Sequence, residues 1–175
     1  MTRSALPPAV RDGRHQDIDA VRAIEQRAAC RFAEVGLAEI ATWPVTGADV
    51  HASAIDDGRL FVVADDGGDG APIGFALVEE YPGAVHLREL DVLPERSGRG
   101  LGTRLLDHAC AWGRERGHRL LTLTTFRDVP FNAPFYARYG FRILDDPPLW
   151  LAALRRAERA AGTDIVPRVA MGIDL

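Results

Sequence analysis

The spacing of apolar residues divides the chain into helices and short strands. Between positions 18 and 36, apolar side chains recur at every third or fourth residue, which predicts an amphipathic helix. A second short helix is expected before Trp43, and 42–57 reads as a loop with at most one helical turn. Further along, apolar and β-branched runs bounded by turn residues predict three strands, at 60–64, 73–79 and 85–93.

The second half of the chain continues with alternating elements. The pattern predicts helices at 101–116, after Asn132 and at 147–161, and strands at 120–126, 141–144 and 168–173. The order strand, helix, strand from 85 to 126 forms a crossover, and a crossover makes its two strands parallel neighbours. We therefore predict an α/β fold of the mixed α+β kind. Its central sheet is mostly antiparallel, has six or seven strands and one parallel pair, and carries helices on both faces.

Composition narrows the function classes. The 175 residues fit a single domain, with 1–13 as a loose leader that runs into a first short strand. The net charge of −4 disfavours nucleic-acid binding. No apolar run approaches the roughly 18 residues of a membrane helix, and 1–14 shows no signal-peptide core, so a cytoplasmic location is predicted. All 21 basic residues are arginine, which excludes Schiff-base, pyridoxal-phosphate and Walker lysines.

Cysteine and histidine positions give no metal signal. Cys30 and Cys110 do not form a CxxC pair, so no thiolate zinc site is expected, and both are interpreted as buried thiols. Four histidines lack metal-ligand spacing and are interpreted as surface residues: His15, His51, His108 and His118. We predict that no metal is bound.

The segment Gly98–Thr103 follows a strand and opens a helix. Its glycines allow close approach of a ligand, and free N–H groups at a helix start favour anions. Positive charge is added around it by Arg96, Arg99 and Arg104. The expected ligand is a pyrophosphate. We call Gly98–Thr103 the cradle. A Rossmann loop would need glycine where Thr103 stands, and a Walker loop would need lysine. A glycine-rich turn without a ligand remains open.

Two motifs carry a family resemblance. Val92-Leu93-Pro94-Glu95 followed by Gly98-Arg99-Gly100-Leu101-Gly102 resembles motif A of the GNAT superfamily of N-acetyltransferases. Phe135-Tyr136-Ala-Arg-Tyr-Gly140-Phe141 resembles motif B. The resemblance implies a GNAT fold with a splayed parallel pair, and an acetyl-CoA-dependent N-acetyltransferase acting on a primary amine of a small molecule or peptide. The alternative is a non-catalytic acyl-CoA-binding module or sensor on the same fold. A longer acyl group also stays open.

The resemblance assigns residues to the co-substrate, acetyl-CoA. Backbone groups of Leu90, Asp91 and Val92 would pair with pantetheine, and the pyrophosphate would lie on the amides of the cradle: Gly98, Arg99, Gly100, Leu101, Gly102 and Thr103. Asn132 either bonds the pantetheine arm or caps the following helix. Ser97 departs from the family, which usually has glutamine or arginine there, and Arg96 or Arg99 is expected to compensate.

Tyr136 stands where the resemblance implies a general acid. A phenol with a pKa of about 10 is protonated at neutral pH and can donate to a leaving thiolate. The base stays open between Glu89, His86, a group elsewhere and no side-chain base at all. The amine itself is not identified by the sequence. As partners we expect no nucleic acid and no membrane, and the resemblance is compatible with a homodimer through the last helix or strand.

Overall fold

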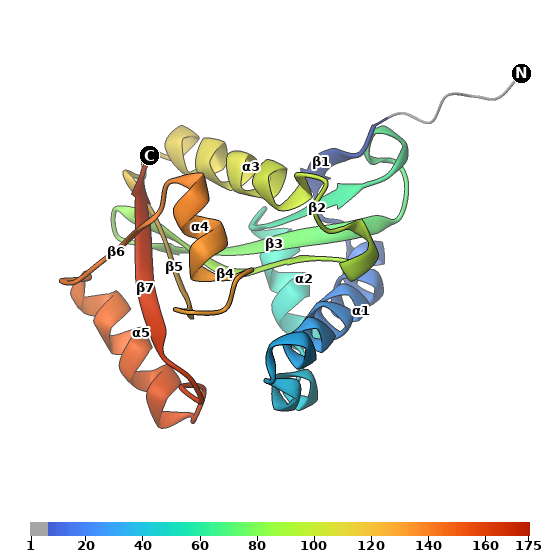
Figure 1. The fold of residues 1–175 in the computed structure, drawn as a ribbon. Coiled ribbons are helices and arrows are strands. Elements are labelled where there is room, and N and C mark those ends of the chain that lie inside the picture. The colour runs from blue at the N-terminus through green and yellow to red at the C-terminus, as the bar shows by residue number, and fades with distance from the viewer. Residues whose placement is uncertain (1–6) are drawn as a thin grey trace, which may run out of the picture. The chain divides into compact units, whose positions relative to one another are not determined.

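A computed structural model describes residues 7–175, apart from the side chain of Asp66 (Figure 1). The residues form two compact units. Among the described residues, the first unit contains 7–79 together with Glu89–Ala111, and the second contains Glu80–Arg88 together with Trp112–Leu175. Residues 1–6 of the predicted leader, 1–13, lie outside the described residues. Its remainder is not loose throughout, because β1 (Ala9–Asp12) pairs with β2.

Within residues 7–175, seven strands are hydrogen-bonded in the order β1-β2-β3-β4-β5-β7-β6. In the first unit, β2 (Leu60–Ala64) pairs antiparallel with β1 and with β3 (Pro72–Tyr81). In the second, β4 (Ala84–Val92) pairs in parallel with β5 (Leu120–Phe126), which pairs antiparallel with β7 (Arg168–Asp174). The edge strand β6 (Arg142–Ile143) is shorter than the predicted 141–144. The mixed sheet and its parallel pair are confirmed.

Helices cover both faces of the strands in the first unit. On one face, α1 (Ile18–Ala29) and α2 (Ala48–Asp56) bury a cluster that shares the sheet residues Phe75 and Leu77. On the other face, Phe61 meets His108 of α3 (Leu101–Glu115) with ring centroids 4.6 Å apart. Because Phe61 alternates with the cluster residues Leu60 and Val62, its side chain belongs to the opposite face.

Short 3-10 helices connect these elements. They span His15–Asp17, Cys30–Val35, Ala38–Thr42, Asp66–Gly68 and Pro94–Arg96. The prediction of a single helix over 18–36 is therefore half right, because α1 ends at Ala29 and continues as a 3-10 helix. The prediction of a loop over 42–57 is wrong. There α2 forms because His51 and Ala54 lie on one helix face and are fully packed.

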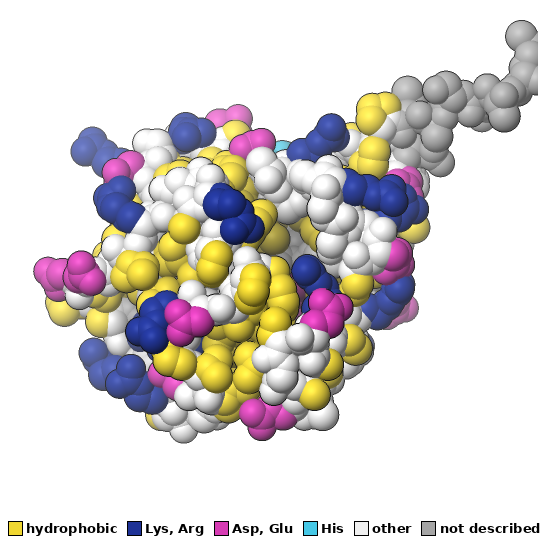
Figure 2. All heavy atoms as spheres, viewed as in Figure 1, with side chains coloured by type: hydrophobic (Ala, Val, Ile, Leu, Met, Phe, Trp, Pro, Cys, Tyr) yellow, Lys and Arg dark blue, Asp and Glu magenta, His cyan; other side chains and the backbone are white. Residues whose placement is uncertain are grey.

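The second unit is completed by α4 (Ala133–Tyr139) and α5 (Leu149–Ala160). Two interpretations of single residues are corrected. His51 is completely buried rather than on the surface, and Cys30 is exposed whereas Cys110 is buried. In residues 7–175, no helix has the length and apolar character needed to cross a membrane. Figure 2 shows basic and acidic side chains intermixed over the visible face.

Candidate functional site

A hydrogen-bonded turn at 93–97 leads from the end of β4 into the cradle, whose last residues begin α3. Leu93 N–H donates to the Ile73 carbonyl at 2.9 Å, and Ser97 N–H donates to the Pro94 carbonyl at 3.1 Å. Gly98 and Gly100 then adopt φ values of +75° and +74°, which L side chains rarely adopt. The loop therefore needs glycine at these two positions, as its sequence suggested.

The outer surface of the cradle is open. Among the described residues, apart from each glycine and its two chain neighbours, no heavy atom lies within 4 Å of where a Cβ would stand on Gly98 or Gly100. Behind the loop, Leu101 is only 5% exposed and anchors the helix start. Arg104 N–H donates to the Gly100 carbonyl, the helical bond that leaves the preceding amides of the turn for an external acceptor. An open glycine-rich loop at a helix start fits a pyrophosphate.

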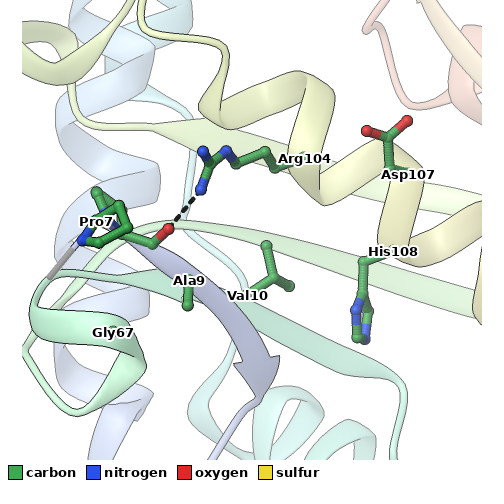
Figure 3. Close-up of a pocket in the computed structure, with 8 residues that line it drawn as sticks. Pro7, Ala9, Val10, Gly67, Arg104, Asp107 and His108 are labelled. Carbon is green, nitrogen blue, oxygen red and sulfur yellow. Dashed lines mark hydrogen bonds between the residues drawn. The ribbon is translucent and has the colours of Figure 1, made fainter.

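The arginines around the cradle are not equivalent. Arg96 forms an ion pair with Asp65 at 2.9 Å, and Arg104 donates to the Pro8 carbonyl (Figure 3). Arg99 is exposed. Ser97 Oγ donates weakly to the Leu93 carbonyl at 3.4 Å. Of the two arginines expected to compensate for Ser97, the geometry favours Arg99, because the Arg96 guanidinium already has a carboxylate partner.

A hollow of about 720 Å³ lies beside Arg104, on the α3 side of β1. Figure 3 shows that α3 contributes Arg104, Asp107 and His108 to its lining and that β1 contributes Ala9 and Val10; the Asp107 carboxylate points away from β1. Sequence reasoning gave no sign of this hollow, because it depends on contacts between positions about a hundred residues apart.

The last residues of β4 present alternate side chains to the two faces of the first unit. A Cβ on Gly74 would lie 3.1 Å from Val92 Cγ2, so Val92 is on the face opposite Phe75. Leu93 packs against the cluster formed by α1 and α2. Asp91, which alternates with Val92, therefore turns its side chain toward the α1 face. The sequence assigned only backbone roles to Leu90, Asp91 and Val92, and those stay predictions.

The carboxyl of Asp91 has an unusual environment. Burial raises its pKa well above the ordinary value, and the negative charges of Glu89 and Glu25 act in the same direction. Among the described residues, the positive charge of Arg31 acts in the opposite direction and lowers this pKa. Glu25 was missed by sequence reasoning, although it interrupts the apolar stripe of α1 between Ile24 and Ala28. Its Oε1 accepts the N–H and hydroxyl of Thr46, at 2.8 and 3.1 Å.

Tyr136 lies on α4 in the second unit. The residue is 7% exposed, and its ring meets those of Phe135 and Phe141 at centroid distances of 5.1 and 5.6 Å. The chain bends back at Gly140, whose N–H donates to the Tyr136 carbonyl. This packing fixes the ring. The role of Tyr136 as general acid stays a prediction.

Asn132 precedes α4 but does not cap it through its side chain. Its carbonyl accepts the N–H groups of Phe135 and Tyr136, and no side-chain cap bond is present. Its Oδ1 is buried and has no hydrogen-bond partner within residues 7–175. The capping alternative is thereby wrong, and the pantetheine alternative stays a prediction, supported by an acceptor that lacks a donor.

His86 is 3% exposed and lies in the paired part of β4. Its Nδ1 is 3.0 Å from Thr122 Oγ1, and that hydroxyl donates to the Val85 carbonyl. Because the hydroxyl proton is already committed, we assign an Nδ1 hydrogen to His86, which it donates to Thr122 Oγ1. His86 also meets Tyr81 and Trp150 edge-on. These contacts hold it as a packed side chain, and its role as a base stays a prediction.

Comparisons with known proteins agree with this architecture. Residues 19–141 match the model of the acetyltransferase (GNAT) family. Two curated relatives are an uncharacterized N-acetyltransferase of Methanocaldococcus jannaschii, 28% identical over 95 residues, and streptothricin acetyltransferase of Streptomyces lavendulae, 35% identical over 89 residues. These matches cover 50% and 49% of this chain, and 42% and 45% of the relatives. The chain thus spans less than half the length of either.

Solved structures share the fold over nearly the whole chain. A Mycobacterium tuberculosis protein in complex with CoA superposes with a TM-score of 0.72 at 17% identity, covering 96% of this chain and 99% of its own. A PaiA N-acetyltransferase from Thermoplasma acidophilum, in complex with coenzyme A, gives 0.64 at 14% identity, covering 97% and 100%. The chain belongs to the GNAT family of acetyltransferases.

Proposed function

We propose that this chain is an acetyl-CoA-dependent N-acetyltransferase that acts on a primary amine of a small molecule or a peptide. The observation that carries the proposal is the cradle. It combines two positive-φ glycines, an open outer surface and a helix start directly after a strand. Family membership supports the same conclusion, since motif A, which covers this loop, lies inside the matched residues.

Each part of the chain has a distinct task in this proposal. The amides of Gly98–Thr103 bind the pyrophosphate, and backbone groups of Leu90–Val92 align pantetheine. Acetyl-CoA, when bound, supplies a thioester whose acetyl carbon accepts the amine. The Tyr136 hydroxyl gives its proton to the departing sulfur, a donation that its protonated phenol allows at neutral pH. A group on β4, with Glu89 and His86 as the sequence candidates, removes a proton from the amine.

The remaining expectations stay predictions. They are a single domain over 1–175, a cytoplasmic location, no metal, no nucleic-acid or membrane partner, and compatibility with a homodimer. Exposed apolar side chains at Ile143 and Leu149 lie near the last helix and strand, where the family resemblance would put a dimer contact.

The test is release of free thiol from acetyl-CoA in the presence of a panel of amines, with the acetylated product identified by mass spectrometry. We expect thiol release that depends on one or more amines. Acetyl-CoA binding without thiol release for every amine would instead indicate the non-catalytic binding module. If the protein neither binds acetyl-CoA nor releases thiol from it, the assignment of the cradle as a pyrophosphate site is contradicted.

A further inference from the structure

The hollow between α3 and β1 has an apolar floor and a basic wall. Its volume of about 720 Å³ falls in the range of roughly 300–1,000 Å³ that is usual for small-molecule sites. The floor is formed by residues 7–10, which are Pro-Pro-Ala-Val, and the wall by α3. All of these residues belong to the first unit, and within residues 7–175 none of the lining residues belongs to the cradle. Mostly apolar surface with a few polar groups on one side is typical of a site for a small organic ligand.

Two basic side chains of α3 line this hollow. Arg104 and His108 are four residues apart, so they lie on one face of the helix. Figure 3 shows the Arg104 guanidinium extended toward Pro8 and the His108 ring turned from α3 toward the strands, whereas the Asp107 carboxylate points away from β1. The wall therefore presents N–H donors toward β1, and the carboxylate of the same helix is not turned the same way.

Contacts with the rest of the first unit orient both donors. The Arg104 guanidinium donates to the Pro8 carbonyl, and since a guanidinium carries five N–H groups, further donors remain for a ligand. The His108 ring packs against Phe61, with ring centroids 4.6 Å apart and an angle of 62° between the ring planes. A histidine ring carries at least one N–H in either charge state. Donors that are already oriented lose less conformational entropy when a ligand binds, which favours affinity.

We propose that this hollow is a binding site for a small organic carboxylate with an apolar body, separate from the acetyl-CoA site. The carboxylate accepts N–H bonds from Arg104, whose planar fork matches two carboxylate oxygens, and from His108. The apolar body lies over Pro8, Ala9 and Val10. A phosphate fits the hollow less well, because its additional charge and oxygens would need donors that the apolar floor does not supply.

Calorimetric titration should compare 2-naphthoate with 2-naphthamide, which has the same apolar body without the charge. We expect the wild type to bind 2-naphthoate about tenfold more tightly, because only the carboxylate makes a charge-assisted contact with Arg104. Arg104→Met retains an apolar stem and should remove this difference, whereas Arg114→Met, at an exposed arginine of the same helix, should preserve it. Equal affinities of the two probes for the wild type, or a preference that survives in Arg104→Met, would overturn the carboxylate site.

Nuclear magnetic resonance of the His108 ring tests where the probe binds. 2-Naphthoate should shift the His108 ring signals, and saturating coenzyme A should leave both this shift and the affinity of the probe unchanged. Displacement of 2-naphthoate by coenzyme A would assign the hollow to the acetyl-CoA site and overturn the proposal of a separate site. His108 signals that respond to protein concentration but not to 2-naphthoate would show that a second copy of the chain covers the hollow, which also overturns it. Neither readout requires acetyl transfer, so failure of this site and failure of the proposed function are distinguishable.

Discussion

Arg96 and Asp65 form an ion pair of 2.9 Å between the turn that precedes the cradle and the turn that follows β2. Both side chains are about one third exposed, at 34% and 35%. The pair therefore holds the flank of the cradle and engages the Arg96 guanidinium before any ligand arrives. Arg99, inside the cradle, is the arginine in position to meet a phosphate.

Arg99→Ala should consequently weaken acetyl-CoA binding about tenfold, or ~1.4 kcal/mol, because a charge-assisted contact is lost. Arg96→Ala should change the dissociation constant much less, since an exposed ion pair contributes about 0–1 kcal/mol. Calorimetric titration at low and high salt measures both, and the Arg99 effect should shrink as salt screens it. A larger effect at Arg96 than at Arg99 would reverse this assignment.

Local pattern was sufficient for much of the fold. The strands predicted at 60–64 and 120–126 match β2 and β5 residue for residue. Both are unbroken β-branched and apolar runs, buried in the sheet and bounded by polar turns. The parallel pair of β4 and β5 was predicted from the strand–helix–strand crossover between 85 and 126. The glycine spacing predicted the conformation of the cradle loop, because Gly98 and Gly100 adopt positive φ angles that other residues rarely adopt.

Features that depend on distant contacts escaped prediction. The helix α2 has only nine residues, and so short a helix is stabilised mainly by tertiary packing, here through His51 and Ala54. The pairing of Arg96 with Asp65 joins positions 31 apart. The electrostatic neighbourhood of Asp91 likewise depends on Glu25, which is on another element. None of these partners is marked by spacing along the chain.

Tyr136→Phe tests the proposed general acid. The variant removes one oxygen from a ring whose contacts with Phe135 and Phe141 remain, so folding and acetyl-CoA affinity should change little. We expect kcat to fall roughly 10²–10³-fold, which corresponds to about 3–4 kcal/mol of transition-state stabilisation. Steady-state kinetics and calorimetry separate the two effects. A lower melting temperature or a loss of acetyl-CoA binding in this variant would show that Tyr136 acts as a packing residue. An unchanged kcat would mean that the thiolate leaves without a proton from Tyr136.

Thr122→Val tests the packed state of His86. The substitution preserves shape but removes the oxygen that lies 3.0 Å from His86 Nδ1, inside a fully buried site. Leaving that N–H without an acceptor should lower the free energy of unfolding by about 1–3 kcal/mol in urea denaturation. Thr103→Val, at an exposed threonine of α3, is the control for stability and should change it by less than about 0.5 kcal/mol. Equal effects at both sites would contradict the assigned hydrogen bond.

Asp17 should make the free energy of unfolding depend on pH in the acidic range. Burial by itself raises the pKa of this carboxyl, but hydrogen bonds from Arg11 and from the Arg14 backbone outweigh burial and lower it. A lowered folded-state pKa contributes stability above the unfolded value of about 3.9, and this contribution is lost as pH falls through the folded pKa.

Asp17→Asn should therefore lower the free energy of unfolding at pH 7 by about 3 kcal/mol, because it breaks a buried pair with Arg11. The difference from wild type should shrink as pH falls below about 4. Asp19→Asn, at an exposed aspartate two residues on, is the comparison. Urea denaturation across this range measures both, and a pH-independent difference would show that the Asp17 charge does not contribute.

The most direct test of the account is whether Gly100 contributes to binding only through the pyrophosphate. Calorimetry should compare coenzyme A with pantetheine, which lacks the pyrophosphate, on wild type and Gly100→Val. Gly36→Val is the matched control, since Gly36 has a similar φ of +78° and equally open space beyond its Cα. We predict that Gly100→Val weakens coenzyme A roughly tenfold to hundredfold and leaves pantetheine unchanged, while Gly36→Val affects neither. Equal losses for both ligands, or no loss for coenzyme A, would contradict the assignment of this loop as a pyrophosphate cradle.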